Sequence, residues 1–301
     1  MPKNPLAEVF GYPVDNMSQE ANNHRQGRLC PYHNSSGLNC TKTSATDPLG
    51  VCTIYDGDKL VITCPIRFRQ DSLILADAAR FFFSGKLQSY LTLSEMRLKD
   101  AHGKSAGNID IVLVTLDEQA RVVDFGAVEV QAVYISGNVR SAFREYLKNP
   151  QANFAMEWPS RNYPNPDYLS SSRKRLVPQL IFKGGILHEW QKKMAVVVHQ
   201  GFFEQLPVLR EVDEQDADIA WFVYDLAYDK KVSRYQLQRV ATQYTKFEDA
   251  LSIISTPTVG DMSEFVASIE ARIKKGKLSG LPLPSPVEPT VEPLPDAFEA
   301  D

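Results

Sequence analysis

The sequence predicts an α/β fold, or α+β, in which helices flank a mixed central sheet. Two observations predict it: apolar stretches of strand length, and longer stretches whose apolar residues recur at helical spacing. The expected strands are residues 107–114, 125–135, 194–198 and 219–226. The expected helices are residues 73–99, 139–148, 176–191, 247–254 and 261–275. A third observation, four cysteines within the first 64 residues, predicts a separate N-terminal metal-binding region.

The helical stretches differ in how clearly they begin and end. The pattern over residues 73–99 could divide at Gly85 or Thr92, which disfavour a helix interior. Residues 139–148 form a short amphipathic pattern that a following Asn-Pro pair ends. Pro178 interrupts the pattern of residues 176–191 near its start. Residues 1–64 show few long apolar runs, so we expect them to be irregular.

Composition limits the classes of protein. The 301 residues are enough for a sizeable core, and 43% hydrophobic with 23% charged residues is ordinary for a globular protein. No run of 18 apolar residues occurs, so we expect no membrane span. The first residues lack the hydrophobic region of a signal peptide, which predicts a cytoplasmic protein.

The formal net charge of −4 at first argues against a nucleic-acid partner. The excess of acid is local, however, because residues 281–301 contain five acids, six prolines and no Lys or Arg. Without these acids the chain would be slightly basic. We therefore predict three regions: a cysteine-rich metal-binding region (1–70), a catalytic domain with insertions (71–278), and a disordered acidic tail (279–301).

The four cysteines are separated by 9, 11 and 11 residues and none occurs later in the chain. In a cytoplasmic protein, clustered cysteines bind metal more often than they form disulfides. Four thiolates would give a closed tetrahedral site of the structural kind, which suits zinc or iron. The usual CxxC pairs are absent, and unrelated buried thiols remain the alternative. The proposed ligands are Cys30, Cys40, Cys52 and Cys64.

Polar residues interrupt two successive apolar strands. Asp110 lies within the first, and Glu129 and Gln131 lie two residues apart on one face of the second. A carboxylate in an apolar strand is costly unless it is paired or binds a metal. If the strands pair through a turn at residues 117–121, Asp110 lies beside Glu129, and two carboxylates with several waters suit Mg²⁺. These residues predict a nuclease site that holds magnesium against a phosphate.

Each of these residues has an ordinary alternative. Asp110 could pair locally, and Glu129 and Gln131 could face solvent from an edge strand. Glu95, on the expected preceding helix, could supply a further carboxylate or belong to a solvated, salt-bridged helix face.

The triad Asp110, Glu129 and Gln131 resembles the PD-(D/E)xK nuclease core, with glutamine where that core usually has lysine. The glutamine and the four upstream cysteines together resemble the NotI-type restriction endonucleases. The stretches 47–52, 64–69 and 162–176 strengthen the resemblance, which covers most of residues 28–230. It implies a homodimeric, Mg²⁺-dependent type II enzyme that cuts a GC-rich palindrome with a GGCC core, CGGCCG, and leaves 5′-phosphate ends.

The resemblance also implies partners and ligands. The four-cysteine site would hold a single structural iron, and the host would carry a companion DNA methyltransferase without physical contact. Gln131 cannot do acid–base work near neutral pH, so water activation would depend on the metal and Glu129.

Candidate DNA contacts are cations that could bind phosphate or guanine. Three of them follow a run of three serines near an expected helix start, a composition suited to phosphate. The candidates are Arg67, Arg69, Arg161, Arg173, Lys174 and Arg175. Two other hypotheses remain: a sequence-specific DNA-binding protein with a degenerate nuclease core, and a structure-specific repair nuclease.

Overall fold

A computed structural model describes residues 3–33, 37–83 and 89–275. The chain divides into two compact units, Met1–Thr256 and Pro257–Asp301. The described part of the second unit holds helix α10 (Met262–Lys274). The acidic tail that we predict at residues 279–301 lies outside the described residues. The region boundaries at residues 70 and 278 stay predictions.

The first unit is built around a six-stranded mixed sheet in the order β12-β11-β10-β7-β6-β5. Strand β10 pairs in parallel with β7 and β11, and the other pairs are antiparallel. This confirms the predicted mixed sheet flanked by helices. The strands are β5 (Leu91–Lys99), β6 (Ser105–Leu116), β7 (Val122–Gln131), β10 (Met194–His199), β11 (Ile219–Asp229) and β12 (Arg234–Thr245).

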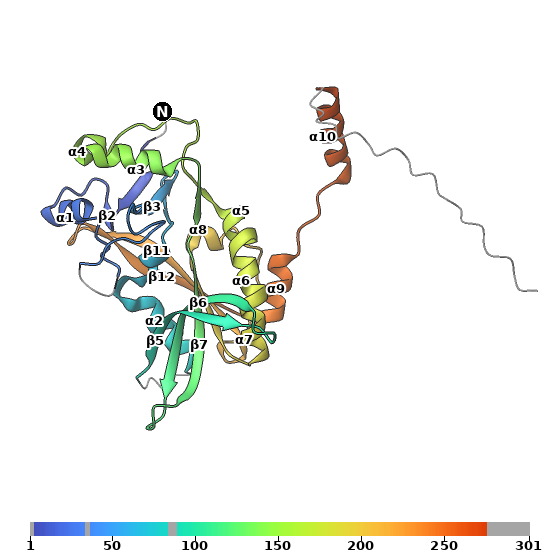
Figure 1. The fold of residues 1–301 in the computed structure, drawn as a ribbon. Helices are drawn as coiled ribbons and strands as arrows, with labels where there is room; N and C mark the ends of the chain where they lie inside the picture. The colour runs from blue at the N-terminus through green and yellow to red at the C-terminus, as the bar shows by residue number, and fades with distance from the viewer. Residues whose placement is uncertain (1–2, 34–36, 84–88, 276–301) are drawn as a thin grey trace, which may run out of the picture. The chain divides into compact units, whose positions relative to one another are not determined.

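Helices cover both faces of this sheet, as Figure 1 shows. Helix α2 (Leu73–Phe82) packs its apolar side chains on one face, against a core cluster that includes Leu113, Val128 and Val197. The opposite face carries Ala127 and Val196, which belong to the second core cluster. That cluster includes residues of the helical run 168–189 and of α9 (Phe247–Ser255). The central strands are therefore buried on both sides, as their continuous apolar runs predict.

Residues 168–189 form one continuous helical run that contains two π-helical turns. Its parts are α5 (Tyr168–Ser171), η2 (Ser172–Leu176), α6 (Val177–Gln179), η3 (Leu180–Gly184) and α7 (Gly185–Glu189). Pro178, which lacks an N–H, lies between the two π turns, where an ordinary α-helical ladder would be broken. The predicted helix over residues 176–191 is confirmed, and it begins earlier than predicted.

The cysteine-bearing region is more regular than the sequence predicts. It contains an antiparallel sheet in the order β2-β1-β3-β4, formed by β1 (Leu6–Val9), β2 (Tyr12–Pro13), β3 (Val51–Asp56) and β4 (Lys59–Ile62). Helix α1 (Gln19–Gly27) lies between β2 and β3 in the chain. The prediction of irregular structure is wrong because these strands are too short to show a clear apolar period.

The predicted helix over residues 73–99 is also wrong beyond α2. Residues Leu91–Lys99 form edge strand β5, whose Leu91 and Leu93 are 53% and 42% exposed. Apolar residues spaced two apart fit a strand, and the longer helical interpretation overlooked this alternation. Strand β12 was not predicted, because only isolated apolar residues occur along it.

The remaining elements connect the sheets. They are η1 (Pro65–Ser72), β8 (Tyr134–Ser136), α3 (Val139–Lys148), α4 (Pro150–Asn153), β9 (Asn165–Asp167), α8 (Gln200–Phe203) and η4 (Glu214–Asp216). Strands β8 and β9 pair antiparallel. Among the described residues, no helix has the length and apolar content needed to cross a membrane.

Candidate active site

The pairing of β6 with β7 brings the predicted acids together. A turn closed by a hydrogen bond between Asp117 N and Arg121 O (2.9 Å) joins the strands. The register pairs Ile111 with Val128, so Asp110 lies opposite Glu129 at the next position. The backbone N–H of Val130 donates to Asp110 Oδ2 at 2.8 Å, which fixes the aspartate beside the glutamate. The structure therefore has the juxtaposition on which the predicted site depends.

Glu95 joins this group from a strand rather than from the expected helix. Its neighbours Ser94 and Met96 pair with Ile111 and Ile109, which places Glu95 opposite Asp110. Glu95 is exposed, and its φ of 55° lies in the left-handed region. Its negative charge contributes to raising the pKa of Asp110. Three acids thus lie side by side on strands β5, β6 and β7.

Burial makes the two inner carboxylates unusual. Glu129 is fully buried, and burial, followed by the nearby charge of Asp110, raises the pKa of Glu129 to about 8. Burial also raises the pKa of Asp110, while the Val130 N–H and the charge of Lys183 oppose this shift. Carboxyl groups with such raised pKa values occur where like charges are held together, and a bound cation relieves that repulsion.

Lys183, on the π turn η3, contacts Glu129 of this pair and was not predicted. Its Nζ donates to both carboxylate oxygens of Glu129, at 2.9 and 2.7 Å, and its side chain is 7% exposed. A signal was present in the sequence: Lys183 occupies a position of helical spacing with Leu176, Leu180 and Leu187, all of which are buried. A lone lysine in an apolar helix stripe needs a buried acidic partner.

Gln131 follows Glu129 on the same face of β7 and is 6% exposed. Its side-chain Nε2 donates to the carbonyl of Ala132 at 2.6 Å. The amide is therefore held next to the acids, but it brings no charge to them. Its catalytic role stays a prediction.

The four cysteines also come together. Backbone hydrogen bonds from Cys30 N to Leu38 O and from Cys40 N to Arg28 O hold the first pair in adjacent segments. Cys52 lies on β3, and Cys64 follows β4. All four thiols are free and buried, and all four residues line one cavity of about 10 Å³. Burial raises the pKa of Cys30 and of Cys52, and that of Cys40 to about 11.

Thiols are the right type of ligand for a zinc or iron ion, but these four thiols are too far apart to coordinate one ion. In the described part of the chain, no three His, Cys, Asp or Glu side chains are close enough to hold a metal ion. The four thiols would have to move together around their shared cavity, and the raised pKa values of Cys30, Cys40 and Cys52 mean that these thiols release protons when a metal binds. His33 lines the same cavity, and its Nε2 is buried without a hydrogen-bond partner among the described residues.

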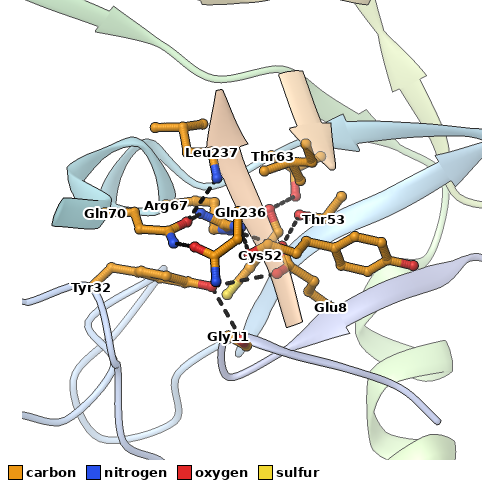
Figure 2. Close-up of polar contacts among 12 residues, drawn as sticks. Glu8, Gly11, Tyr32, Cys52, Thr53, Thr63, Arg67, Gln70, Gln236 and Leu237 are labelled. Carbon is orange, nitrogen blue, oxygen red and sulfur yellow. Dashed lines mark hydrogen bonds and ion pairs between the residues drawn. The ribbon is translucent and has the colours of Figure 1, made fainter. Parts of the chain in front are cut away.

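Arg67 is a correction to the predicted DNA contacts. It is fully buried and forms an ion pair with Glu8 at 2.9 Å, as Figure 2 shows. Its other N–H groups donate to Gln70 Oε1 (2.6 Å) and to the carbonyl of Tyr235 (2.9 Å). The guanidinium also lies 4.3 Å from the centre of the Tyr32 ring. An arginine enclosed in this way is part of the core and is not available to a DNA phosphate or base.

The other candidate cations are accessible. Arg69 is half-buried, and its charge lowers the pKa of Asp110. Arg175 is exposed and its guanidinium lies 4.8 Å from the ring centre of Tyr134. The remaining exposed candidates are Arg161, Arg173 and Lys174. Their placement allows DNA contact, which stays a prediction.

Comparison with known proteins identifies the family. Residues 8–237 match the family described as restriction endonuclease NotI, a range that includes all four cysteines and strands β6 and β7. No curated protein matches the chain. The match defines a site-specific deoxyribonuclease. The chain belongs to the NotI restriction endonuclease family, and it is therefore a type II restriction endonuclease that acts on double-stranded DNA.

Proposed function

We propose that this enzyme is a homodimer of PD-(D/E)xK nucleases that cuts both strands of a palindrome with a GGCC core. The chain is short for this family and in this respect resembles EagI. From that resemblance we propose CGGCCG as the recognition site and 5′-phosphates at the new ends. Magnesium is the proposed catalytic cofactor. One observation carries the proposal: Asp110 and Glu129 lie side by side on adjacent strands, and the Val130 N–H holds the aspartate in place.

The roles of the residues follow from their positions. Asp110 and Glu129 would bind the magnesium ion, which when bound lowers the pKa of an attacking water and stabilises the phosphate charge. Glu95 lies opposite Asp110 on exposed strand β5, where it could accept a hydrogen bond from a water in the ion's shell. Gln131 would hydrogen-bond the water or phosphate after it releases the Ala132 carbonyl.

DNA binding is assigned to the accessible cations. Arg173, Lys174 and Arg175 are the exposed residues of one π turn, which suits contact with phosphates. Arg161 and Arg69 remain candidates for phosphate or guanine contacts, since bidentate arginine is the commonest reader of guanine. A palindrome cut by one centre per chain requires two symmetry-related chains.

A structural ion, iron or zinc, is proposed for the four cysteines. Their shared cavity and common burial support it. The companion methyltransferase remains an expectation about the host.

The test is a digest of phage or plasmid DNA with purified protein and Mg²⁺, followed by sequencing of the fragment ends. A single palindrome with a GGCC core at every end supports the proposal and gives the cut position. Duplex binding without cleavage would indicate a degenerate nuclease core, and ends without a shared sequence would indicate a structure-specific nuclease. Absorption spectra of the fresh protein distinguish iron from zinc, because zinc is colourless.

A further inference from the structure

Lys183 is buried beside the proposed catalytic acids with a specific partner. Two of the three N–H donors of its ammonium go to the two oxygens of Glu129. In the described residues, it is the only cation with a hydrogen bond to Asp110 or Glu129. A water or phosphate oxygen that approaches Glu129 therefore comes within reach of this ammonium.

Lys183 lies on the π turn η3, and Gly107 on β6 leaves space for its side chain. The π turn η3 alters the helical register just where Lys183 leaves the backbone, and π turns are frequent at functional sites. On β6, Gly107 has a φ of +113°, and a Cβ there would lie 3.1 Å from Lys183 Cε. A side chain at residue 107 would crowd the stem of the lysine, so glycine keeps its path to Glu129 open.

The neighbouring strand offers no substitute charge. Gln131 stands two residues from Glu129, where the nuclease core that the chain resembles usually has lysine, and its amide is bound to the Ala132 carbonyl. A neutral amide cannot stabilise the negative charge that builds on a phosphate as an ammonium can. The chain thus holds a positive charge at the acids, but supplies it from the helix rather than from β7.

We infer that Lys183 is a catalytic residue of the cleavage reaction: its ammonium contacts both Glu129 and an oxygen of the scissile phosphate, in place of a lysine at residue 131. The inference rests on the proposed function of the Asp110–Glu129 site. Lys183 acts by charge and hydrogen bonding alone, and it neither gives nor takes a proton. A buried ion pair with a purely structural role is the competing explanation.

The first test measures DNA binding without cleavage. Duplexes carry the recognition site with either a normal phosphate or an uncharged methylphosphonate at the scissile position found by end sequencing, and binding is measured in Ca²⁺. We expect the methylphosphonate to weaken binding by the wild type about tenfold more than binding by Lys183→Met, because the lysine's charged hydrogen bond is lost in addition to the Ca²⁺ contact that both proteins share. Equal penalties for both proteins would overturn the inference.

The matched control is Lys193→Met. Lys193 is half-buried, and its Nζ lies 3.3 Å from the Phe81 carbonyl and 4.4 Å from the centre of the Phe81 ring. This lysine has no contact with the acids, so Lys193→Met should keep the full wild-type penalty. A reduced penalty in the control as well would contradict a specific contact by Lys183.

The second test moves the positive charge from residue 183 to residue 131. Single-turnover cleavage by Lys183→Met should be on the order of a hundredfold slower than wild type. Adding Gln131→Lys should recover at least tenfold of that loss, since residue 131 lies on the same strand face as Glu129. No recovery in a folded double variant contradicts the inference.

If Lys183→Met fails to fold, Lys183→Arg keeps the charge and serves instead. It should retain the methylphosphonate penalty while cutting more slowly than wild type, and loss of the penalty would contradict a charge contact. The two proposals fail in different ways. A wild type that cuts nothing disproves the proposed function, whereas a wild type that cuts beside a fully active, folded Lys183→Met disproves only the role of Lys183.

Discussion

Two buried ion pairs in this enzyme have similar N–O distances but differ in their other hydrogen-bond partners and in the charges beside them. Glu8 and Arg67 meet at 2.9 Å with both side chains fully buried, and Glu129 and Lys183 meet at 2.7 Å with exposures of 0% and 7%. The first pair joins β1 of the cysteine-bearing sheet to η1, and the second joins β7 of the six-stranded sheet to the π turn η3.

The Glu8–Arg67 pair has a complete set of partners. Glu8 also accepts a hydrogen bond from the hydroxyl of Thr53, and Arg67 donates to Gln70 and to the Tyr235 carbonyl. The network joins β1, β3, η1 and β12 (Figure 2). Fully satisfied buried charges of this kind fix one arrangement of the elements that hold them.

The Glu129–Lys183 pair has a like charge beside it. Asp110 contributes to the raised pKa of Glu129, about 8, and one ammonium faces two carboxyl groups. An additional cation would stabilise the two carboxylates Asp110 and Glu129, whereas Arg67 already neutralises the single charge of Glu8. The difference teaches that burial of an ion pair does not distinguish structure from function, but the number and charge of its other neighbours does.

The largest expected effect is that of Glu129→Ala. Loss of this carboxylate removes a proposed metal ligand, so cleavage should fall on the order of a thousandfold or more while duplex binding is retained. The measurement is single-turnover cleavage of a duplex with one site. Glu118→Ala, at an exposed turn position, is the control and should cut normally. A fully active Glu129→Ala protein would remove the catalytic assignment.

Arg67→Met should act on stability instead. It leaves Glu8 buried without its cation, which costs about 3–5 kcal/mol of unfolding free energy, measurable by urea denaturation. The double variant Glu8→Gln/Arg67→Met should recover much of the loss, because no buried charge is left unpaired. A stable Arg67→Met protein that has lost DNA binding would restore Arg67 as a DNA contact.

Stability of the metal-free enzyme should depend on pH through Glu129. Its pKa rises from an ordinary 4.5 to about 8, so between these values the folded state holds a proton that the unfolded state has released. The free energy of unfolding should therefore fall as pH rises from about 4.5 to about 8. Urea unfolding in EDTA at pH 5, 6.5 and 8 measures this, and Glu129→Gln should show a shallower fall. Identical pH profiles in the two proteins would refute the prediction.

Gln131→Ala should leave residual cleavage. The amide contributes hydrogen bonds but no charge, and their loss corresponds to a rate about 10–100 times slower. Single-turnover kinetics at saturating Mg²⁺ distinguish this from Glu129→Ala. A rate as low as that of Glu129→Ala would show that Gln131, rather than Lys183, carries the essential function beside the acids.

The smallest effects are expected on the exposed π turn. Each single change of Arg173, Lys174 or Arg175 to alanine should lower the slope of log affinity against log salt by about one if that side chain contacts a phosphate. Fluorescence anisotropy at several salt concentrations in Ca²⁺ measures it. Lys231→Ala, in an exposed hairpin turn, should leave the slope unchanged. Unchanged slopes in all three variants would remove this surface from the DNA interface.

The sequence predicted the pairing of β6 with β7 because both strands are long, apolar and joined by a short turn. It therefore placed Asp110 beside Glu129 before any contact was known. The sequence predicts a helix at Glu95 where the structure has a strand with exposed leucines, and it predicts no strands at β1–β4, which are too short to show a period. Local patterns predict elements well only where the apolar residues form a continuous run, as in β10, and not along β5 and β12, which are longer strands without such a run.

Contacts between distant segments were beyond local patterns. Arg67 is predicted to contact DNA because it is a cation that could bind phosphate or guanine. Spacing along the chain does not reveal its buried partner Glu8, which is 59 residues away. Lys183 was missed for the same reason, since 54 residues separate it from Glu129. In both cases, the sequence showed a charge in apolar surroundings but not the acid that would neutralise it.

The most direct test is single-turnover cleavage, per DNA-bound molecule, by two double variants in which each ion pair is replaced by neutral residues. Glu129→Gln/Lys183→Met should bind the site and leave it uncut. Glu8→Gln/Arg67→Met, measured at a temperature where it is folded, should cut at nearly the wild-type rate. Normal cleavage by the first variant, or an inactive but folded second variant, would contradict the assignment of the two pairs.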